Sequence, residues 1–174
     1  MLNEKMTEHG DEAVSSDRIS QSTRERDGRL VVDLENYVPH LLSAVNNALS
    51  GGASKVYLER FDIGIAEWRV MSMLAIEPRI QASQICDIIK IDKGAASRAL
   101  SRLDAKGLLG YDAVVTDQRK RIWWLNEAGL SLHDTILQVA LGREQKLVEG
   151  IEPQDLEAFL RAIRTMVRNV DSVR

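Results

Sequence analysis

The sequence has little of what several protein classes require. Its 174 residues include one cysteine, three prolines and eleven glycines. A single cysteine excludes an intrachain disulfide framework and a zinc site built from several cysteines. The low proline and glycine content argues against a fibrous or loop-dominated chain. No apolar run approaches the ~18 residues that span a bilayer, so we expect no membrane-spanning segment.

The beginning of the chain lacks the apolar core of a secretory signal. Residues 1–29 are polar and charged, and their few apolar side chains follow no clear period. They therefore resemble neither a signal peptide nor a packed element. We expect a flexible polar tail over residues 1–29 and a soluble, cytoplasmic protein.

The chain also lacks an overall excess of positive charge. Its 23 Lys and Arg and 26 Asp and Glu residues give a net charge of -3, which excludes a uniformly basic nucleic-acid binder. The charge is uneven, however. Residues 79–125 hold nine basic and five acidic side chains, a net charge of +4, so the remainder carries -7. A binding partner is therefore expected at this central basic segment.

Hydrophobic residues make up 44% of the chain, enough to build a core. They recur every three or four positions in six segments, which predicts helices. These segments are about 33–60, 65–76, 82–89, 93–106, 127–149 and 153–170. Between the fourth and fifth segments the period changes to two on both sides of a polar turn at 116–120, which predicts a β-hairpin. Asp92 and Asn126 are expected to be helix N-caps.

Two short helices joined by a tight turn and followed by a hairpin indicate a winged helix-turn-helix. The fold class is then all-α with a small β-wing. The long flanking helices are not needed by a compact winged domain, so we expect their apolar faces to pack against a second subunit. The expected organisation is a tail (1–29), a first dimerisation helix (30–62), a winged helix-turn-helix DNA-binding region (63–126) and C-terminal dimerisation helices (127–174).

Helix 93–106 presents a small, cationic face once its core positions are removed. This face carries Lys93, Ser97, Arg98, Ser101 and Arg102. Small residues permit close approach to a DNA major groove, and arginine can bond a guanine edge with two hydrogen bonds. The alternative is an ordinary solvated helix face. The hairpin that follows favours the DNA-reading interpretation.

Three consecutive cations, Arg119, Lys120 and Arg121, are predicted at the hairpin tip. They could contact phosphates or enter a minor groove, where negative potential is concentrated. Asp117 is expected to accept hydrogen bonds in the turn and to orient Arg119. The alternative is a charged hairpin that keeps the protein soluble.

These residues, with their spacing, resemble the pattern of MarR-family transcriptional regulators over about residues 33–170. The resemblance rests on Tyr37-Val38-Pro39, Trp68-Arg69-Val70, Asp92-Lys93, Ser97-Arg98-Ala99-Leu100, Arg102-Leu103, Lys106-Gly107-Leu108, Asp117 with Arg119, and Leu125-Asn126-Glu127-Ala128-Gly129. It implies a homodimeric repressor or activator that binds double-stranded DNA at a near-palindromic operator. Helix 93–106 would lie in the major groove and the wing, 110–125, in the flanking minor groove.

The sequence departs from that family pattern at the start of the reading helix and in the wing. Gly94-Ala95-Ala96 stands where members often have Ser-Thr-Val, so base readout would depend on Ser97, Arg98 and Arg102. Trp123 and Trp124 replace a common Leu-Arg pair. We expect Trp123 in the core and Trp124 on the opposite face of the hairpin.

The resemblance also implies a small-molecule effector, often an aromatic acid, bound between the dimerisation region and the winged domain. The candidate crevice residues are Tyr37, His40, Trp68, Arg69 and Trp124. Arginine or histidine would pair with a carboxylate, and the aromatic side chains would stack on a ring. The alternative is core packing for Trp68 and solvent exposure for His40.

Other chemistry finds little support. Peroxide-sensing relatives carry their reactive cysteine in the first helix, so Cys86 is expected to be a packed thiol. His9, His40 and His133 have no nearby metal-ligand partners, and we expect no metal or cofactor. No Gly-rich phosphate loop or catalytic triad pattern indicates an enzyme. The alternative function is a dimeric winged-helix protein-interaction module without specific DNA binding. The negative net charge would favour it, as would the small side chains of Gly94-Ala95-Ala96 at the start of the reading helix.

Overall fold

The computed structural model describes residues 18–114 and 117–173. The chain forms two compact units, Met1–Leu49 and Ser50–Arg174, and helix α1 (Val38–Phe61) crosses from one to the other. The first unit contains β1 (Thr23–Arg26) and β2 (Arg29–Val32). The second contains α2 (Ile65–Ile76), β3 (Ile80–Gln81), α3 (Ala82–Ile89), α4 (Lys93–Ala105), β4 (Leu109–Val114), β5 (Asp117–Leu125), α5 (Glu127–Leu147), α6 (Pro153–Asn169) and a 3₁₀ turn (Val170–Val173).

The segment expected to be a flexible tail is partly structured, so that expectation is wrong for residues 23–29. β1 and β2 pair antiparallel across a turn at Asp27 and Gly28, both of which have positive φ. Such two-residue turns match the twist of a hairpin. Residues 1–17, the first part of the expected tail, lie outside the described residues.

The first helix begins later than its apolar period predicted. Residues 33–36 form a turn in which the Asp33 carboxylate accepts hydrogen bonds from the Glu35 N–H (3.2 Å) and the Asn36 amide (2.8 Å). The Asn36 hydrogen bond is the main reason that the pKa of Asp33 lies below its usual value. Pro39 then falls in the first turn, as predicted, where its missing N–H costs nothing. The glycine pair 51–52 does not end the helix.

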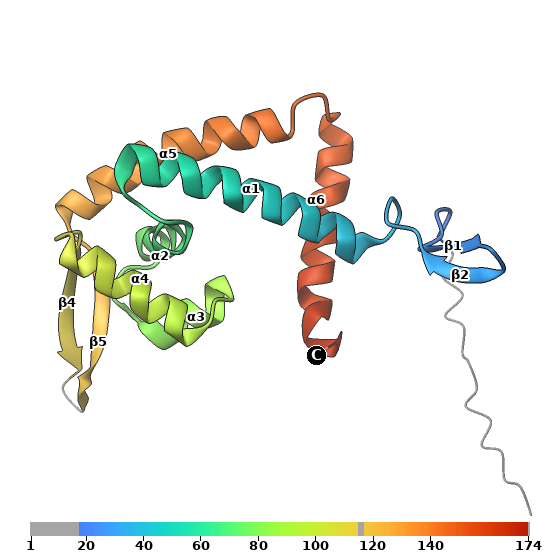
Figure 1. Cartoon of the computed structure of the whole chain (residues 1–174). Helices are drawn as coiled ribbons and strands as arrows, with labels where there is room; N and C mark the ends of the chain where they lie inside the picture. Colours follow the sequence, from blue (N-terminus) through green and yellow to red (C-terminus); the bar gives the residue numbers. More distant parts are fainter. Residues whose placement is uncertain (1–17, 115–116, 174) are drawn as a thin grey trace, which may run out of the picture. The chain divides into compact units, whose positions relative to one another are not determined.

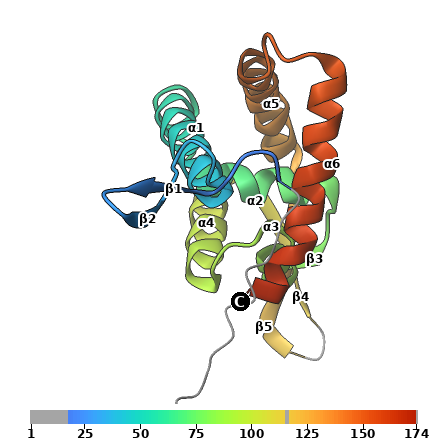
Figure 2. The same ribbon diagram turned by 90° about the vertical axis from the view of Figure 1, so that its right-hand side faces the viewer.

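Helix α2 is the centre of the second unit. It contacts α3, α4, α5 and β5, and Figures 1 and 2 show the helices of this set around it. Its Val70, Met71 and Leu74 are almost completely buried. Burial of each such side chain contributes about 1.5–3 kcal/mol to folding. The surrounding elements complete the core with Ala53, Tyr57, Ile85, Leu100, Leu103, Trp123, Leu125 and Ile136.

The predicted hairpin is present and gains a third, short strand. The sheet order is β3-β5-β4, with both pairings antiparallel. Two residues of β3 were not predicted as a strand. The predicted turn at 116–120 is wrong in part, because β5 already begins at Asp117. Trp123 is 7% exposed and Trp124 is half-buried, in agreement with their predicted opposite faces.

Both predicted N-caps are confirmed. Asp92 accepts a hydrogen bond from the Ala95 N–H (2.8 Å) at the start of α4. Asn126 does the same for the Gly129 N–H (2.9 Å) at the start of α5. Gly129 also lets the first turn of α5 lie close to the backbone of Leu108, because a Cβ at this position would overlap the Leu108 carbonyl oxygen. The wing is thereby fixed to α5 at its base.

The flanking helices leave many apolar side chains in water. Large exposed ones include Leu41, Leu42, Val45, Leu141, Leu147, Phe159, Met166 and Val167. Helix α6 has no buried residue, although its apolar positions recur with helical spacing. Within the described part of the chain, no helix has both the length and the hydropathy needed to cross a bilayer.

Candidate nucleic-acid interface

Helix α4 separates its buried and exposed positions completely. The residues that face the core are Ala96, Ala99, Leu100 and Leu103. The residues predicted to contact DNA, Lys93, Ser97, Arg98, Ser101 and Arg102, are all exposed. The helix therefore offers a polar, cationic face without giving up a core position.

Gly94 leaves room for Arg98 at the start of α4. A Cβ at Gly94 would lie 3.0 Å from the Arg98 Nη1 atom and 3.1 Å from the Asp92 Oδ1 atom. The guanidinium thus folds back over the first helical turn. Because Gly94 has no side chain, the Arg98 guanidinium can lie against the backbone at this position.

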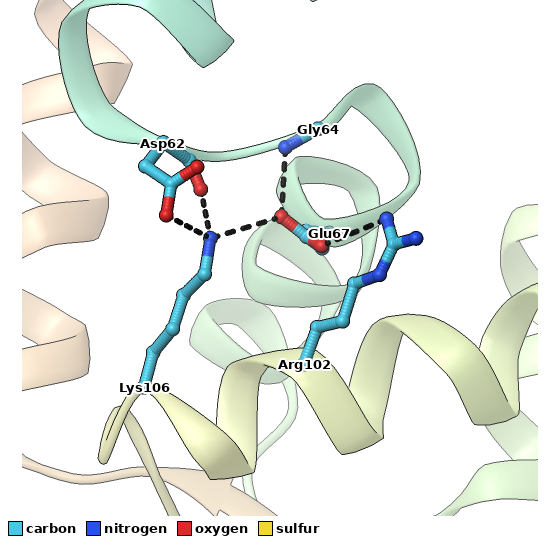
Figure 3. A network of polar contacts seen from close by, with 5 residues as sticks. All are labelled: Asp62, Gly64, Glu67, Arg102 and Lys106. Carbon is cyan, nitrogen blue, oxygen red and sulfur yellow. Dashed lines mark hydrogen bonds and ion pairs between the residues drawn. The ribbon is translucent and has the colours of Figure 1, made fainter.

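A buried carboxylate lies behind α4, and no local sequence pattern predicted it. Glu67 of α2 is 3% exposed, and its Oε2 atom accepts a hydrogen bond from the Gly64 N–H (2.7 Å). Figure 3 shows two cations of the α4 segment reaching it: Arg102 Nη1 lies 3.5 Å from Oε1 and Lys106 Nζ 3.6 Å from Oε2. Lys106 also contacts the carboxylate of Asp62 (3.2 Å) and its carbonyl oxygen.

This network gives Arg102 a partner within the protein. Its side chain is 70% exposed, whereas the Glu67 side chain is 4% exposed. Lys106 and the Gly64 N–H also contact Glu67, so the carboxylate has a cation and a hydrogen-bond donor besides Arg102. The Arg102 side chain is therefore accessible from solvent while it pairs with Glu67.

In the wing, Arg121 lies against the strands and not at the tip, where it was predicted. It is directly opposite Ala113 in the ladder, and its guanidinium lies 4.0 Å from the Tyr111 ring centroid. It also lies 3.9 Å from Asp104 of α4. Lys120 is exposed. The side chains of Asp117 and Arg119 lie outside the described residues, so their predicted roles remain predictions.

A hollow of about 500 Å³ lies between α4 and the wing. It brings together four residues that were predicted to contact DNA, Ser97 and Ser101 from α4 and Lys120 and Arg121 from β5. Asp104 and Trp123 also line it. The two elements that carry the predicted contacts therefore share one concave surface.

Arg79 supports the opposite face of the wing and was not predicted. It has a left-handed backbone (φ 68°), and its N–H donates to the Trp123 carbonyl (2.9 Å). Its guanidinium lies 4.5 Å from the Trp124 ring centroid and pairs with Asp112. It thus connects the end of α2 to both long strands.

The candidate effector residues have separate surroundings. Trp68 packs between Tyr57 (5.8 Å between ring centroids) and His133 (5.3 Å). Burial raises the pKa of Tyr57, which the positive charge of Arg143 partly offsets. Trp124 instead lines a hollow of about 290 Å³ with Leu74, Ala75, Pro78, Arg79, Leu125 and Leu130.

The remaining candidates are more exposed. Arg69 is solvent-exposed in the second unit. Tyr37 and His40 lie in the first unit and are exposed, so the Tyr37 ring does not line a buried pocket there. The expected crevice formed by all five residues is therefore not established and remains a prediction.

Cys86 is a half-buried free thiol in α3. His9 lies outside the described residues. In the described ranges 18–114 and 117–173, no group of three or more His, Cys, Asp or Glu side chains is arranged to hold a metal ion.

In sequence and fold, the chain is similar to known regulators of transcription. Residues 61–120 match the family model described as MarR family. The transcriptional regulator HosA of Escherichia coli O127:H6 is 20% identical over 106 residues, which cover 61% of this chain and 78% of HosA.

Solved structures agree with the fold. A MarR/EmrR family transcriptional regulator from Acinetobacter sp. ADP1 is 26% identical, with a TM-score of 0.74 over 81% of this chain and 99% of that one. Bordetella bronchiseptica BpsR, whose DNA binding is regulated by 6-hydroxynicotinic acid, is 20% identical, with a TM-score of 0.66 over 75% of this chain and 98% of that one.

Proposed function

Because the chain belongs to the MarR family of transcriptional regulators, we propose that it binds double-stranded DNA as a homodimer and represses transcription until a small effector releases it. The observation that carries this proposal is the exposed face of α4, which is cationic and small while its opposite face is fully buried. No catalytic step is involved.

In this mechanism α4 enters the major groove. Arg98 reads or clamps a base edge, and Lys93, Ser97 and Ser101 contact phosphates or base edges. Arg102 leaves Glu67 when a phosphate becomes accessible. The wing follows the backbone, with Arg119 in the minor groove and Lys120 on phosphate. Arg121, whose guanidinium lies over the Tyr111 ring, would contact phosphate from the side of the wing.

The exposed apolar side chains of α1, α5 and α6 are the surface that a second copy would cover. Two identical reading helices related by a two-fold axis require equivalent half-sites about one helical turn apart. We therefore propose a near-palindromic operator.

The proposed effector is a small aromatic acid. The regulation of BpsR by 6-hydroxynicotinic acid supports this chemical class. The exposed guanidinium of Arg69 would pair with the carboxylate of the effector. Trp68 would stack on its ring once His133, which is stacked on Trp68, moves aside. Release then follows if the effector binds better to dimers whose reading helices are misaligned with the operator.

The test uses a duplex selected by the wild-type chain from a randomised library. Arg98→Ala and Arg119→Ala should each weaken binding to this duplex by about 1–3 kcal/mol, measured by fluorescence anisotropy. Arg60→Ala changes an exposed cation at the end of α1, outside the proposed DNA and effector surfaces, and is the control; it should bind as the wild type does.

Unchanged affinity for both the Arg98 and the Arg119 variants would contradict the proposed reading surface. A chain that selects no duplex at all, yet is dimeric, would favour the protein-interaction module.

A further inference from the structure

The N-terminal hairpin is a cationic element that the proposed function does not use. β1 and β2 lie before α1 and outside residues 61–120, which match the family model. Every described side chain of the two strands is exposed except Val31, which is half-buried. The hairpin therefore contributes little to the core of its own unit.

The register of the hairpin sorts its side chains onto two unlike faces, because directly paired residues in an antiparallel ladder point to the same side. The pairs on one face are Arg24 with Val31 and Arg26 with Arg29, and the pairs on the other are Thr23 with Val32 and Glu25 with Leu30. Three arginines thus share one side, which we call the arginine face (Arg24, Arg26 and Arg29).

The hairpin is attached to the segment that leads into α1 (Figure 1). The Asp33 N–H donates to the Ser22 carbonyl oxygen (2.9 Å) below the last strand pair. The Arg18 guanidinium donates to the Asn36 carbonyl oxygen (2.9 Å) and to the Ser22 hydroxyl (2.6 Å). These bonds close the base of the hairpin and hold it as an ordered arm.

The acidic groups near the arginine face neutralise it only weakly. Arg26 Nε lies 3.8 Å from Asp27 Oδ2, and both side chains are more than three-quarters exposed. Exposed pairs of this kind contribute little energy. Arg24 is a minor cause of the lowered pKa of Asp33, after the Asn36 hydrogen bond. The arginine face therefore keeps its attraction for an external anion.

We propose that the arginine face binds the phosphate backbone of duplex DNA, as a second contact besides α4 and the wing. Guanidinium groups suit phosphate because each can donate two parallel hydrogen bonds. Three of them on one side of a two-stranded ribbon can each neutralise a phosphate and release its counterion. This inference rests on the proposed function, since the DNA held by α4 is the DNA that the arm would contact.

The experiment measures binding of the full chain to a mixed-sequence duplex over a range of salt concentrations. The variant carries Arg24→Gln, Arg26→Gln and Arg29→Gln together. The matched control carries Arg24→Lys, Arg26→Lys and Arg29→Lys, which keep the charge. Circular dichroism and thermal unfolding establish that each protein is folded.

The glutamine variant should bind more weakly, and the slope of log K against log salt should become shallower by about 0.9 for each phosphate that the arginines no longer neutralise. The lysine variant should keep most of the wild-type slope. In footprints on the selected duplex, the glutamine variant should leave unprotected some positions that Arg98→Ala still protects.

Wild-type slope and affinity in the glutamine variant, with weakened binding by Arg98→Ala, would overturn this inference and leave the proposed function standing. A lysine variant as weak as the glutamine variant would overturn the phosphate contact. A wild-type chain that binds no duplex at low salt would overturn both proposals.

Discussion

Glu67 is a carboxylate that the fold has removed from water and supplied with two cations from another segment. Its neighbours are Arg102 and Lys106, at 3.5 and 3.6 Å, and the Gly64 N–H. A buried charge of this kind is costly without its partners. It therefore fixes the start of α2 to the last turns of the reading helix.

The substitution Glu67→Gln should destabilise the protein by about 1–2 kcal/mol. A neutral amide would replace the carboxylate with which Arg102 and Lys106 form ion pairs. The destabilisation is limited because Arg102 and Lys106 can turn toward water. The same change should strengthen binding to mixed-sequence duplex at low salt, since Arg102 is released. Urea unfolding and anisotropy measure the two effects.

Arg102→Gln is the matched control for that prediction. It removes the exchangeable cation, so it should weaken DNA binding while Glu67 keeps Lys106. If Glu67→Gln weakened DNA binding as much as Arg102→Gln, the exchange of Arg102 between Glu67 and phosphate would be refuted.

At the scale of elements, α4 depends on its first turn. Asp92 supplies the side-chain cap, and its Oδ1 atom lies beside Gly94, where Arg98 folds back. The cap satisfies an N–H that would otherwise have no partner within the helix. The same residue thus shapes both the helix start and the surface offered to DNA.

Asp92→Ala should lower the free energy of unfolding by about 0.5–2 kcal/mol, because it removes the cap. Asp92→Asn keeps a capping oxygen and should remain close to the wild type. Urea midpoints distinguish the two. Equal destabilisation by both variants would mean that the charge of Asp92, and not its hydrogen bond, stabilises the helix.

The elements that the sequence could predict are those whose signals are local. The caps Asp92 and Asn126 depend on residues within one helical turn. The hairpin at 23–32 was missed although Asp27-Gly28 is a strong turn signal. The residues before that turn are Thr-Arg-Glu-Arg and not alternating apolar residues, so the strand pattern was hidden.

The contacts of the candidate site were less predictable because they join distant segments. Lys106 reaches Asp62 across 44 positions, and Arg79 reaches Asp112 across 33. No local pattern encodes such pairs; they follow from the packing of α4 and the wing on α2. The face of α4 could be predicted because it needs only the helical period.

At the scale of the whole molecule, the charge is unevenly divided between the proposed DNA-binding surface and the rest of the chain. The segment 79–125, with a net charge of +4, contains α4 and the whole wing, whereas the remaining residues carry -7. An acidic remainder disfavours indiscriminate attraction to DNA. The arginine face of the N-terminal hairpin is an exception within that acidic remainder.

The most direct test of the central claim is the affinity of the full chain for its selected duplex as salt is raised. If α4 and the wing bind DNA as proposed, log K should fall linearly with log salt, with two chains bound per duplex and a marked preference for the selected sequence over a scrambled one. Binding that is absent at low salt, or equal for both sequences, would contradict the claim.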